Sequence, residues 1–165
     1  VGVYQIMINI VYAAVAAFIL AADQLVKLFI TRNFELYESF GSIGRIVDFV
    51  HVRNTGAAFS IMSGKVEILS VISIVFCVGV LVYWIKKRPV HPLLCTSLSM
   101  LAAGALGNAI DRIFRGYVVD FISLAFVDFP VFNIADMAIT VGAVLIIIYV
   151  MFFDRENKNK EDKNK

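Results

Sequence analysis

Charged residues are scarce in this sequence. Asp, Glu, Lys and Arg together make up 17% of the 165 residues, whereas hydrophobic residues make up 60%. A soluble domain averages about 25% charged and about 45–50% apolar residues. The mean hydropathy is +0.83, so an ordinary soluble domain is excluded. The length is typical of a single domain.

Several signatures of other function classes are also missing. There is no phosphate-binding loop, no dinucleotide fingerprint, no Gly-x-Gly-Asp motif of presenilin-like intramembrane proteases and no basic surface for nucleic acid. His51 and His91 lie on either side of a complete apolar run, so they cannot share a zinc site. Cys77 and Cys95 fall within or near apolar runs, which argues against a disulfide in an oxidising exterior. We therefore expect no metal, no cofactor and no nucleic-acid partner.

What the sequence does contain is a set of four long apolar runs: Tyr4–Ala22, Val66–Ile85, Leu93–Ala109 and Ile134–Phe153. A helix needs about 20 residues to cross the hydrocarbon core at about 1.5 Å per residue, and these runs do not alternate as barrel strands would. The third is the weakest, because serines and glycines interrupt it. The pattern predicts an all-α polytopic membrane protein with transmembrane helices over about 4–31, 64–86, 92–114 and 132–153.

Basic residues indicate the orientation of these helices. Lys86-Lys87-Arg88 closes the second run, and a lysine-rich tail follows the fourth. Lys and Arg favour the cytoplasmic side, and an even number of crossings puts both termini on that side. We therefore predict cytoplasmic termini, a single four-helix membrane domain over residues 1–154 and a disordered cytoplasmic tail over residues 155–165.

Two longer connections then face outward. In the first, Ile46–Arg53 is rich in β-branched and aromatic residues with partial alternation, which predicts a small extracytoplasmic β element within about 33–60. In the second, Phe114–Val131 carries aromatic residues that suit an interfacial segment. Connections of this length between helices are often functional.

Two aspartates occupy the same end of the predicted bundle. Asp120 lies in the connection between the third and fourth runs, and Asp136 lies in the first turn of the fourth. Ionisable groups at membrane depth are costly and mark a functional site by default. For Asp136 alone, a carboxylate stabilised by the helix dipole is an alternative explanation.

Other polar residues at this end have structural as well as functional explanations. Asp23 and Lys27 share a helix face and can form an interfacial ion pair, with Lys27 reaching outward along the helix. Asn54 and Gly56 indicate a tight turn, which can simply return the chain to the second helix.

A further group lies around the third and fourth helices. Asn108, Asp111 and Arg112 share one helix face, which also suits a helix terminus with a local ion pair. Asn133 and Asp136 are three residues apart, so both can point into the bundle.

Paired aspartates suggest a reaction. In a partly dehydrated site, ionisation of both carboxyls costs too much free energy. The pKa of one carboxyl is therefore raised, and the pair shares a proton. The ionised partner can take a proton from water, while the protonated one polarises a carbonyl and then protonates the leaving amine. This is aspartic peptidase chemistry. A serine mechanism is poorly supported, because no serine is placed at the depth of a lysine or histidine on a neighbouring helix.

Two rival classes fit the composition. In a small proton- or ion-coupled transporter the same carboxylates would bind a cation or relay protons. The charges, however, gather near one face and do not follow a path across the membrane. A purely structural membrane scaffold leaves the cluster of Asn and Asp residues unexplained.

Five fragments of the sequence resemble the bacterial lipoprotein signal peptidase (signal peptidase II) family. They are Asp23-x-x-x-Lys27, Asn54-x-Gly56-Ala-Ala-Phe59, Gly104-Ala-Leu-Gly-Asn108-Ala-Ile-Asp111-Arg112, Val118-Val-Asp120-Phe121 and Phe132-Asn133-Ile-Ala135-Asp136. Each fragment alone is weak, but five in the family's order and at compatible spacing are specific. The resemblance extends from Asp23 to Phe153.

The resemblance implies an intramembrane aspartic endopeptidase with Asp120 and Asp136 as its catalytic dyad. It also implies a set of residues that bind substrate or support the site: Asp23, Lys27, Asn54, Gly56, Asn108, Asp111, Arg112, Asn133 and Ala135. The family removes the signal peptide from prolipoproteins, just before a cysteine that carries diacylglycerol, and is inhibited by the cyclic peptide globomycin. The expected partners are thus a lipid-modified prolipoprotein and membrane lipid. A monomer in the bacterial cytoplasmic (inner) membrane, with its site near the outer leaflet, is expected.

Overall fold

The structure is a computed structural model that describes residues 2–56 and 62–153. Its helices are α1 (Gly2–Asn33), α2 (Val66–Lys87), α3 (Pro92–Arg115) and α4 (Ile134–Phe152). Its strands are β1 (Ser39–Ile43), β2 (Val47–Asn54) and β3 (Val118–Leu124). The four helices are long and apolar enough to cross a membrane, so the predicted fold class is confirmed. The predicted tail at 155–165 and residues 57–60 of the predicted β element lie outside the described residues.

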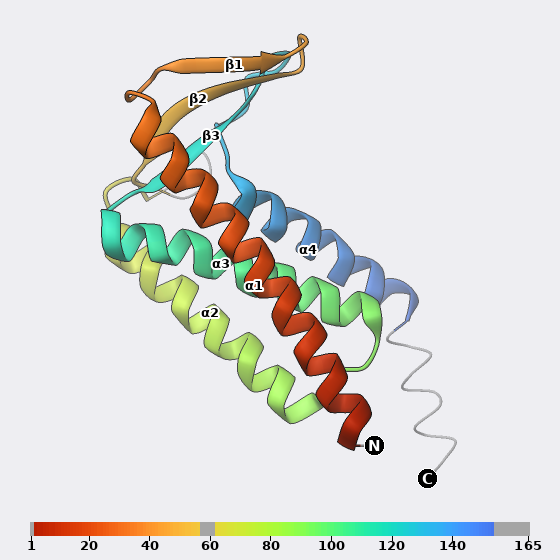
Figure 1. Cartoon of the computed structure of the whole chain (residues 1–165). Helices are drawn as coiled ribbons and strands as arrows, with labels where there is room; N and C mark the ends of the chain where they lie inside the picture. Colours follow the sequence, from red (N-terminus) through yellow and green to blue (C-terminus); the bar gives the residue numbers. More distant parts are fainter. Residues whose placement is uncertain (1, 57–61, 154–165) are drawn as a thin grey trace.

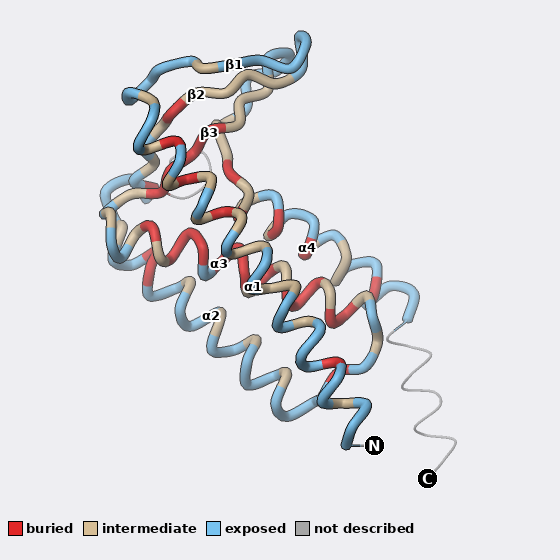
Figure 2. Tube along the Cα trace, in the orientation of Figure 1, coloured by how far each residue is buried: buried red, intermediate tan, exposed pale blue. Residues whose placement is uncertain are grey.

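Helix α3 is the centre of the bundle, and it packs against α1, α2 and α4 (Figure 1). In its apolar stretch 67% of the residues are buried, against 6%, 11% and 22% of the residues in those of α1, α2 and α4. Figure 2 shows the buried positions concentrated along α3. The serines and glycines that weaken its hydropathy are therefore tolerated, because they face protein instead of lipid.

The outer helices expose large apolar side chains. Phe18 of α1 is 75% exposed, Val75 of α2 is 65% exposed and Met151 of α4 is 63% exposed. Continuous apolar surface of this kind is unfavourable in water, whereas a bilayer requires it. The chain is a multi-pass membrane protein.

Small residues bring α3 and α4 into close contact. A Cβ atom added at Gly104 would meet the carbonyl oxygen of Ala135 and the side chain of Ile139. One added at Gly107 would lie 2.8 Å from Asp23 Oδ2 and 3.3 Å from the Cβ of Ala135. Small residues allow membrane helices to approach closely. This contact holds the first turn of α4 against the second half of α3.

The three strands form one antiparallel sheet in the order β1-β2-β3, at the end of the bundle away from the start of α1 (Figure 1). β1 and β2 form a hairpin in the first connection, where the sequence predicted a small β element. β3 was not expected, because the sequence predicted only an interfacial segment over Phe114–Val131. Residues Val118–Phe121 are buried, and a strand buried on both faces lacks the polar alternation that marks a half-exposed strand.

β3 alternates between two environments. Val119 and Phe121 join a core cluster with Ile30 of α1, whereas Val118 and Asp120 line a cleft between the helices. Successive side chains of a strand point to opposite faces. Pairing of Asp120 with Val52 of β2 fixes this register, so the strand delivers one carboxylate to the cleft.

Candidate active site

Asp120 and Asp136 line the same cleft, which has a volume of about 750 Å³. The cleft lies between α2 and α4, with residues of α3 between them and β3 with residues 129–132 at the sheet end. Most of its lining is apolar. Its polar members are Asn54, Ser73, Asn108, Arg112, Asp120, Asp136 and Thr140.

The carboxylate of Asp120 accepts one hydrogen bond on each oxygen. Asn54 Nδ2 donates to Oδ2 at 3.0 Å, and Asn133 Nδ2 donates to Oδ1 at 2.6 Å. The side chain is only 2% exposed. The carboxylate is therefore held by amide donors from β2 and from the residue that precedes α4.

Asp136 is held in a similar way. Asn108 Nδ2 donates to its Oδ1 at 2.8 Å, and the backbone N–H of Asn133 donates to its Oδ2 at 3.2 Å. Asn133 is the N-cap of α4, and its side-chain oxygen accepts the backbone N–H of Asp136 at 2.9 Å. This reciprocal capping box begins the helix. The same asparagine therefore starts α4 and contacts both aspartates.

Burial and the neighbouring carboxylate set the protonation of Asp120. Loss of hydration raises its pKa to about 7, and the negative charge of Asp136 adds to the rise. The hydrogen bonds from Asn54 and Asn133 and the charge of Lys27 oppose the rise without cancelling it. Asp120 can therefore hold or release a proton near neutral pH.

Lys27 is fully buried behind the cleft. Its Nζ lies 2.9 Å from Asp23 Oδ2 and 2.9 Å from Asp111 Oδ2, and it donates to Asn108 Oδ1 at 3.1 Å. The interpretation of Lys27 as a residue that reaches outward from an interfacial pair is wrong, because its side chain is 0% exposed. The two carboxylates keep the ammonium inside the protein.

Asp23 and Asp111 also accept backbone N–H groups next to Asp136 and Asp120. Asp23 Oδ1 accepts the N–H of Ala135 at 2.9 Å, in the first turn of α4. Asp111 Oδ2 accepts the N–H of Val119 at 3.2 Å, next to Asp120. The ion pair therefore anchors the two backbone segments that carry the aspartates.

Asn54 and Gly56 form a tight turn after β2. The N–H of Gly56 donates to Asn54 Oδ1 at 2.8 Å, which turns Nδ2 of Asn54 toward Asp120. Arg112 Nη2 donates to the carbonyl of Gly56 at 2.9 Å. The guanidinium lines the cleft and also holds this turn in place.

The structure therefore brings the sequence-predicted residues into one assembly with two layers. The layer that lines the cleft contains Asn54, Asn108, Arg112, Asp120 and Asp136. The layer behind it supports these residues and contains Asp23, Lys27, Gly56, Asp111, Asn133 and Ala135.

Two residues of this assembly were missed by the sequence analysis. Gln24 Nε2 donates to Asp23 Oδ2 and to the carbonyl of Gly107, both at 3.1 Å. Arg115 Nη1 lies 3.1 Å from Asp111 Oδ1. The four-residue spacing between Asp111 and Arg115 was a signal for the second contact. Nothing in the sequence singled out Gln24 beyond its place next to Asp23.

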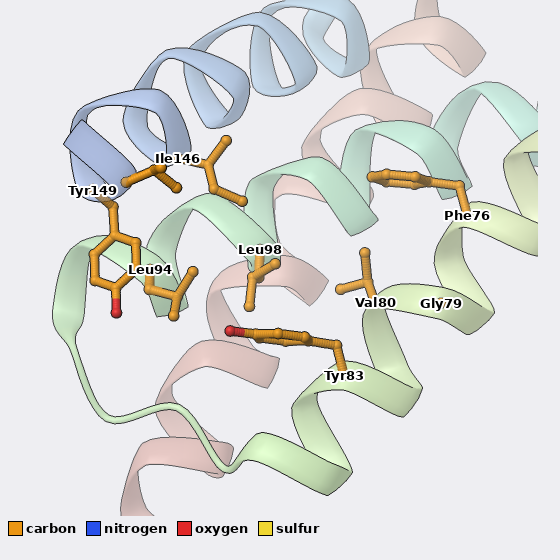
Figure 3. Close-up of a pocket in the computed structure, with 9 residues that line it drawn as sticks. Phe76, Gly79, Val80, Tyr83, Leu94, Leu98, Ile146 and Tyr149 are labelled. Carbon is orange, nitrogen blue, oxygen red and sulfur yellow. The ribbon is translucent and has the colours of Figure 1, made fainter. Parts of the chain in front are cut away.

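A second hollow continues along the same face of α3, nearer the start of that helix. Its volume is about 380 Å³, and Phe76 lines both it and the cleft. Figure 3 shows apolar and aromatic side chains of α2, α3 and α4 around it. The residues of α3 that line the two hollows follow one helical stripe: Leu94, Leu98, Leu101, Ala105, Asn108 and Arg112.

No group of three or more His, Cys, Asp or Glu residues is arranged to hold a metal ion, within the part of the chain that the structure describes.

Residues 15–152 match the family model for signal peptidase (SPase) II. The chain belongs to the signal peptidase II family. It is 38% identical over 151 residues to the lipoprotein signal peptidase of Staphylococcus aureus, covering 90% of this chain and 91% of that protein. It is 36% identical over 154 residues to that of Geobacillus thermodenitrificans (strain NG80-2), covering 92% and 96%.

Solved structures agree with this membership. One bacterial membrane enzyme is 36% identical and matches with a TM-score of 0.83 over 91% of both chains. Another is 37% identical and matches with a TM-score of 0.79 over 87% of this chain and 94% of its own. The signal peptidase II family is a peptidase family, so this chain is a peptidase and the transporter alternative is set aside.

Proposed function

We propose that this chain removes the signal peptide from diacylglyceryl-modified prolipoproteins by hydrolysing the bond before the lipidated cysteine. The observation that carries the proposal is the placement of Asp120 and Asp136 in one apolar cleft. Membership of the signal peptidase II family and the lipoprotein signal peptidases among its relatives support the substrate class.

Asp120 and Asp136 are the catalytic dyad in this proposal. Asp120 carries the shared proton at rest, which its pKa of about 7 supports. Its O–H polarises the scissile carbonyl, while the carboxylate of Asp136 takes a proton from water as the water oxygen attacks the carbonyl carbon. The tetrahedral intermediate collapses when the C–N bond breaks and a dyad proton passes to the leaving amine. The four amide donors on the carboxylates keep both acids oriented throughout.

Arg112 and Asn54 are the residues best placed to hold the substrate backbone. Both line the cleft beside the dyad, and each can offer N–H donors to a peptide carbonyl. Arg112 also ties down the turn at Gly56. We therefore assign it both roles, substrate contact and support of the turn.

The shape of the cleft fits a lipid-linked peptide. Apolar residues of α2 and α4 flank the dyad, so acyl chains can remain in the lipid phase while the peptide bond reaches the carboxylates. The second hollow continues the same stripe of α3 toward the other membrane face. The apolar helix of the signal peptide can lie along this stripe.

We also propose the setting of the enzyme. Residues 1–154 act as one monomeric peptidase domain in the bacterial cytoplasmic (inner) membrane, surrounded by lipid. The start of α1, the end of α4 and Lys86-Lys87-Arg88 lie at the cytoplasmic face, and the sheet covers the site at the outer leaflet. Lys86 and Lys87 in the last turn of α2, at the end of the bundle opposite the sheet, support this orientation.

The test is cleavage of a diacylglyceryl-modified prolipoprotein by detergent-solubilised enzyme, followed by mobility shift. We expect cleavage that globomycin prevents. Asp120→Asn and Asp136→Asn are each expected to lower kcat by about 10²- to 10⁴-fold, because each removes a proton-transfer group.

Asp128→Asn is the matched control, because Asp128 is an exposed carboxylate in the same connection. It should cleave at the normal rate. Normal turnover by either dyad variant, with the variant folded, would refute the proposed chemistry.

A further inference from the structure

The ammonium of Lys27 has three hydrogens and no acceptor, and it has three contacts. Two are the carboxylates of Asp23 and Asp111, each at 2.9 Å. The third is the side-chain oxygen of Asn108 at 3.1 Å. The group is fully buried, so protein atoms satisfy it without help from bulk water.

Charge balance accounts for the first two contacts, whereas the third contact supplies only an acceptor for the remaining N–H group. Asp23 and Asp111 carry two negative charges, and Lys27 and Arg115 carry two positive charges within ion-pair distance of them. Asn108 is neutral and adds nothing to this balance. Its contact with Lys27 therefore has another consequence.

That consequence is the orientation of the Asn108 amide. An asparagine side chain has an accepting end and a donating end. Because Lys27 can only donate, the oxygen of Asn108 faces Lys27 and its nitrogen faces away. The nitrogen then donates to Asp136 Oδ1 at 2.8 Å. A reversed amide would set an N–H group against the ammonium and an oxygen against the carboxylate.

The orientation extends to the other aspartate. The oxygen of Asn108 also accepts Asn133 Nδ2 at 3.1 Å, and the same nitrogen donates to Asp120 Oδ1 at 2.6 Å. One N–H of Asn133 is thus directed by Asn108 and the other by Asp120. Two series of hydrogen bonds therefore begin at Lys27. One reaches Asp136 through Asn108, and the other reaches Asp120 through Asn108 and Asn133.

We propose that Lys27 is a positioning residue of the peptidase reaction, which acts by locking the amide of Asn108 and hence the donors on both aspartates. It touches neither the cleft nor the reacting atoms. The inference rests on the proposed function and deepens it. The competing explanation is that Lys27 only neutralises Asp23 and Asp111 and so serves folding alone.

Lys27→Met removes the donor while keeping an unbranched side chain of similar reach. We expect kcat for the lipidated prolipoprotein to fall about 10- to 100-fold, as misplacement of catalytic groups does. KM is expected to stay within about threefold, because Lys27 does not line the cleft. This variant also leaves a carboxylate uncompensated, so its thermal unfolding temperature should fall.

The double variant Lys27→Met/Asp23→Asn separates the two explanations. It removes the carboxylate that Lys27→Met leaves unpaired, while Asp111 keeps its ion pair with Arg115. The amide oxygen introduced at position 23 can still accept the N–H of Ala135. We expect it to unfold at a higher temperature than Lys27→Met yet to keep the low kcat, because Asn108 still lacks its donor. Asp23→Asn alone completes the cycle and shows how much kcat that change costs by itself.

The outcomes are distinct. A folded Lys27→Met enzyme with the kcat of the unmodified enzyme would overturn the inference, as would a double variant in which kcat recovers together with stability. Rates are expressed per folded molecule, from the monodisperse gel-filtration fraction, so partial unfolding does not hide the answer. Absence of cleavage by the unmodified enzyme would overturn the proposed function and this inference together. Normal cleavage by the unmodified enzyme and by Lys27→Met would overturn this inference alone.

Discussion

At the scale of single residues, three asparagines hold the two acids in place. Asn54, Asn108 and Asn133 direct N–H groups at the carboxylates of Asp120 and Asp136. Each asparagine is itself fixed, by the N–H of Gly56, by Lys27 and by the N–H of Asp136 respectively. Neutral donors suit this task, because a cation in direct contact would hold both acids permanently ionised.

The raised pKa of Asp120 predicts a pH-dependent stability. Its folded pKa of about 7 lies above the unfolded value of about 3.9, so folding favours the neutral carboxyl. The stability from this group is complete below about pH 4 and is lost as the pH rises through about 7. Between pH 5 and pH 8 the unfolding temperature of the unmodified protein in detergent should therefore fall further than that of Asp120→Asn. Equal slopes for the two proteins would contradict the assignment.

Sequence reasoning at this scale reached most of the site but misjudged Lys27. The i, i+4 spacing to Asp23 is the same for a buried pair and for an interfacial one. What decides between them is Asp111, which arrives from another helix. A local pattern contains no information on that third partner, so burial of the ammonium could not be predicted.

At the scale of elements, the contact between α3 and α4 sets the geometry of the dyad. The capped start of α4 can reach Asn108 only because Gly104 and Gly107 leave room for Ala135. The four helices were predictable, because long apolar runs are a strong signal, even though serines and glycines interrupt the third run. β3 was not, because burial of Val118–Phe121 erases its alternation.

Two helix glycines give a matched test of this contact. Gly104→Ala should lower the free energy of unfolding by about 1–3 kcal/mol, because the new methyl group overlaps Ala135 and Ile139. Gly79→Ala, in α2, meets nothing within 4 Å and should raise it by up to about 1 kcal/mol through helix propensity. Unfolding in detergent measures both. Equal effects of the two substitutions would show that α3 and α4 are not in close contact.

A larger side chain at Gly79 tests whether the signal peptide occupies the second hollow, because Gly79 lines that hollow. Gly79→Leu should fill this hollow and lower kcat/KM for full-length prolipoprotein about tenfold, which corresponds to about 1.4 kcal/mol. A lipopeptide truncated to the residues around the cleavage site should be cleaved at the normal rate, because it does not extend that far.

Val78→Leu is the control for this substitution, because Val78 is 53% exposed and does not line the hollow. Cleavage of full-length substrate should be normal in this variant. If Gly79→Leu lowers kcat/KM equally for the full-length and the truncated substrate, the signal peptide does not occupy the second hollow.

At the scale of the whole molecule, the candidate site and the basic residues at the end of α2 lie at opposite ends of the bundle. The sheet, the dyad and the buried ion pairs lie at one end, and Lys86-Lys87-Arg88 lies at the other. In the proposed function, this division places the cleaved bond at the membrane face opposite the basic residues.

The proposed orientation predicts opposite chemical accessibility for these two ends. In a background where Cys77 and Cys95 are replaced by serine, Ser39→Cys in β1 should react with a membrane-impermeant maleimide in intact cells. Lys87→Cys at the end of α2 should react only after permeabilisation. The reverse pattern would place the sheet in the cytoplasm and contradict an active site at the outer leaflet.

The double role of Asn133 has a consequence for drug resistance. The residue caps α4 and contacts both acids. A mutation of Asn133 that moves the acids and weakens inhibitor binding is therefore expected also to destabilise the start of α4. Resistance mutations against a compound that binds between the aspartates are therefore expected at apolar residues that line the cleft, such as Leu69, Ile72 and Met137. Compounds that draw their affinity from the acids and asparagines are therefore expected to select few resistant variants.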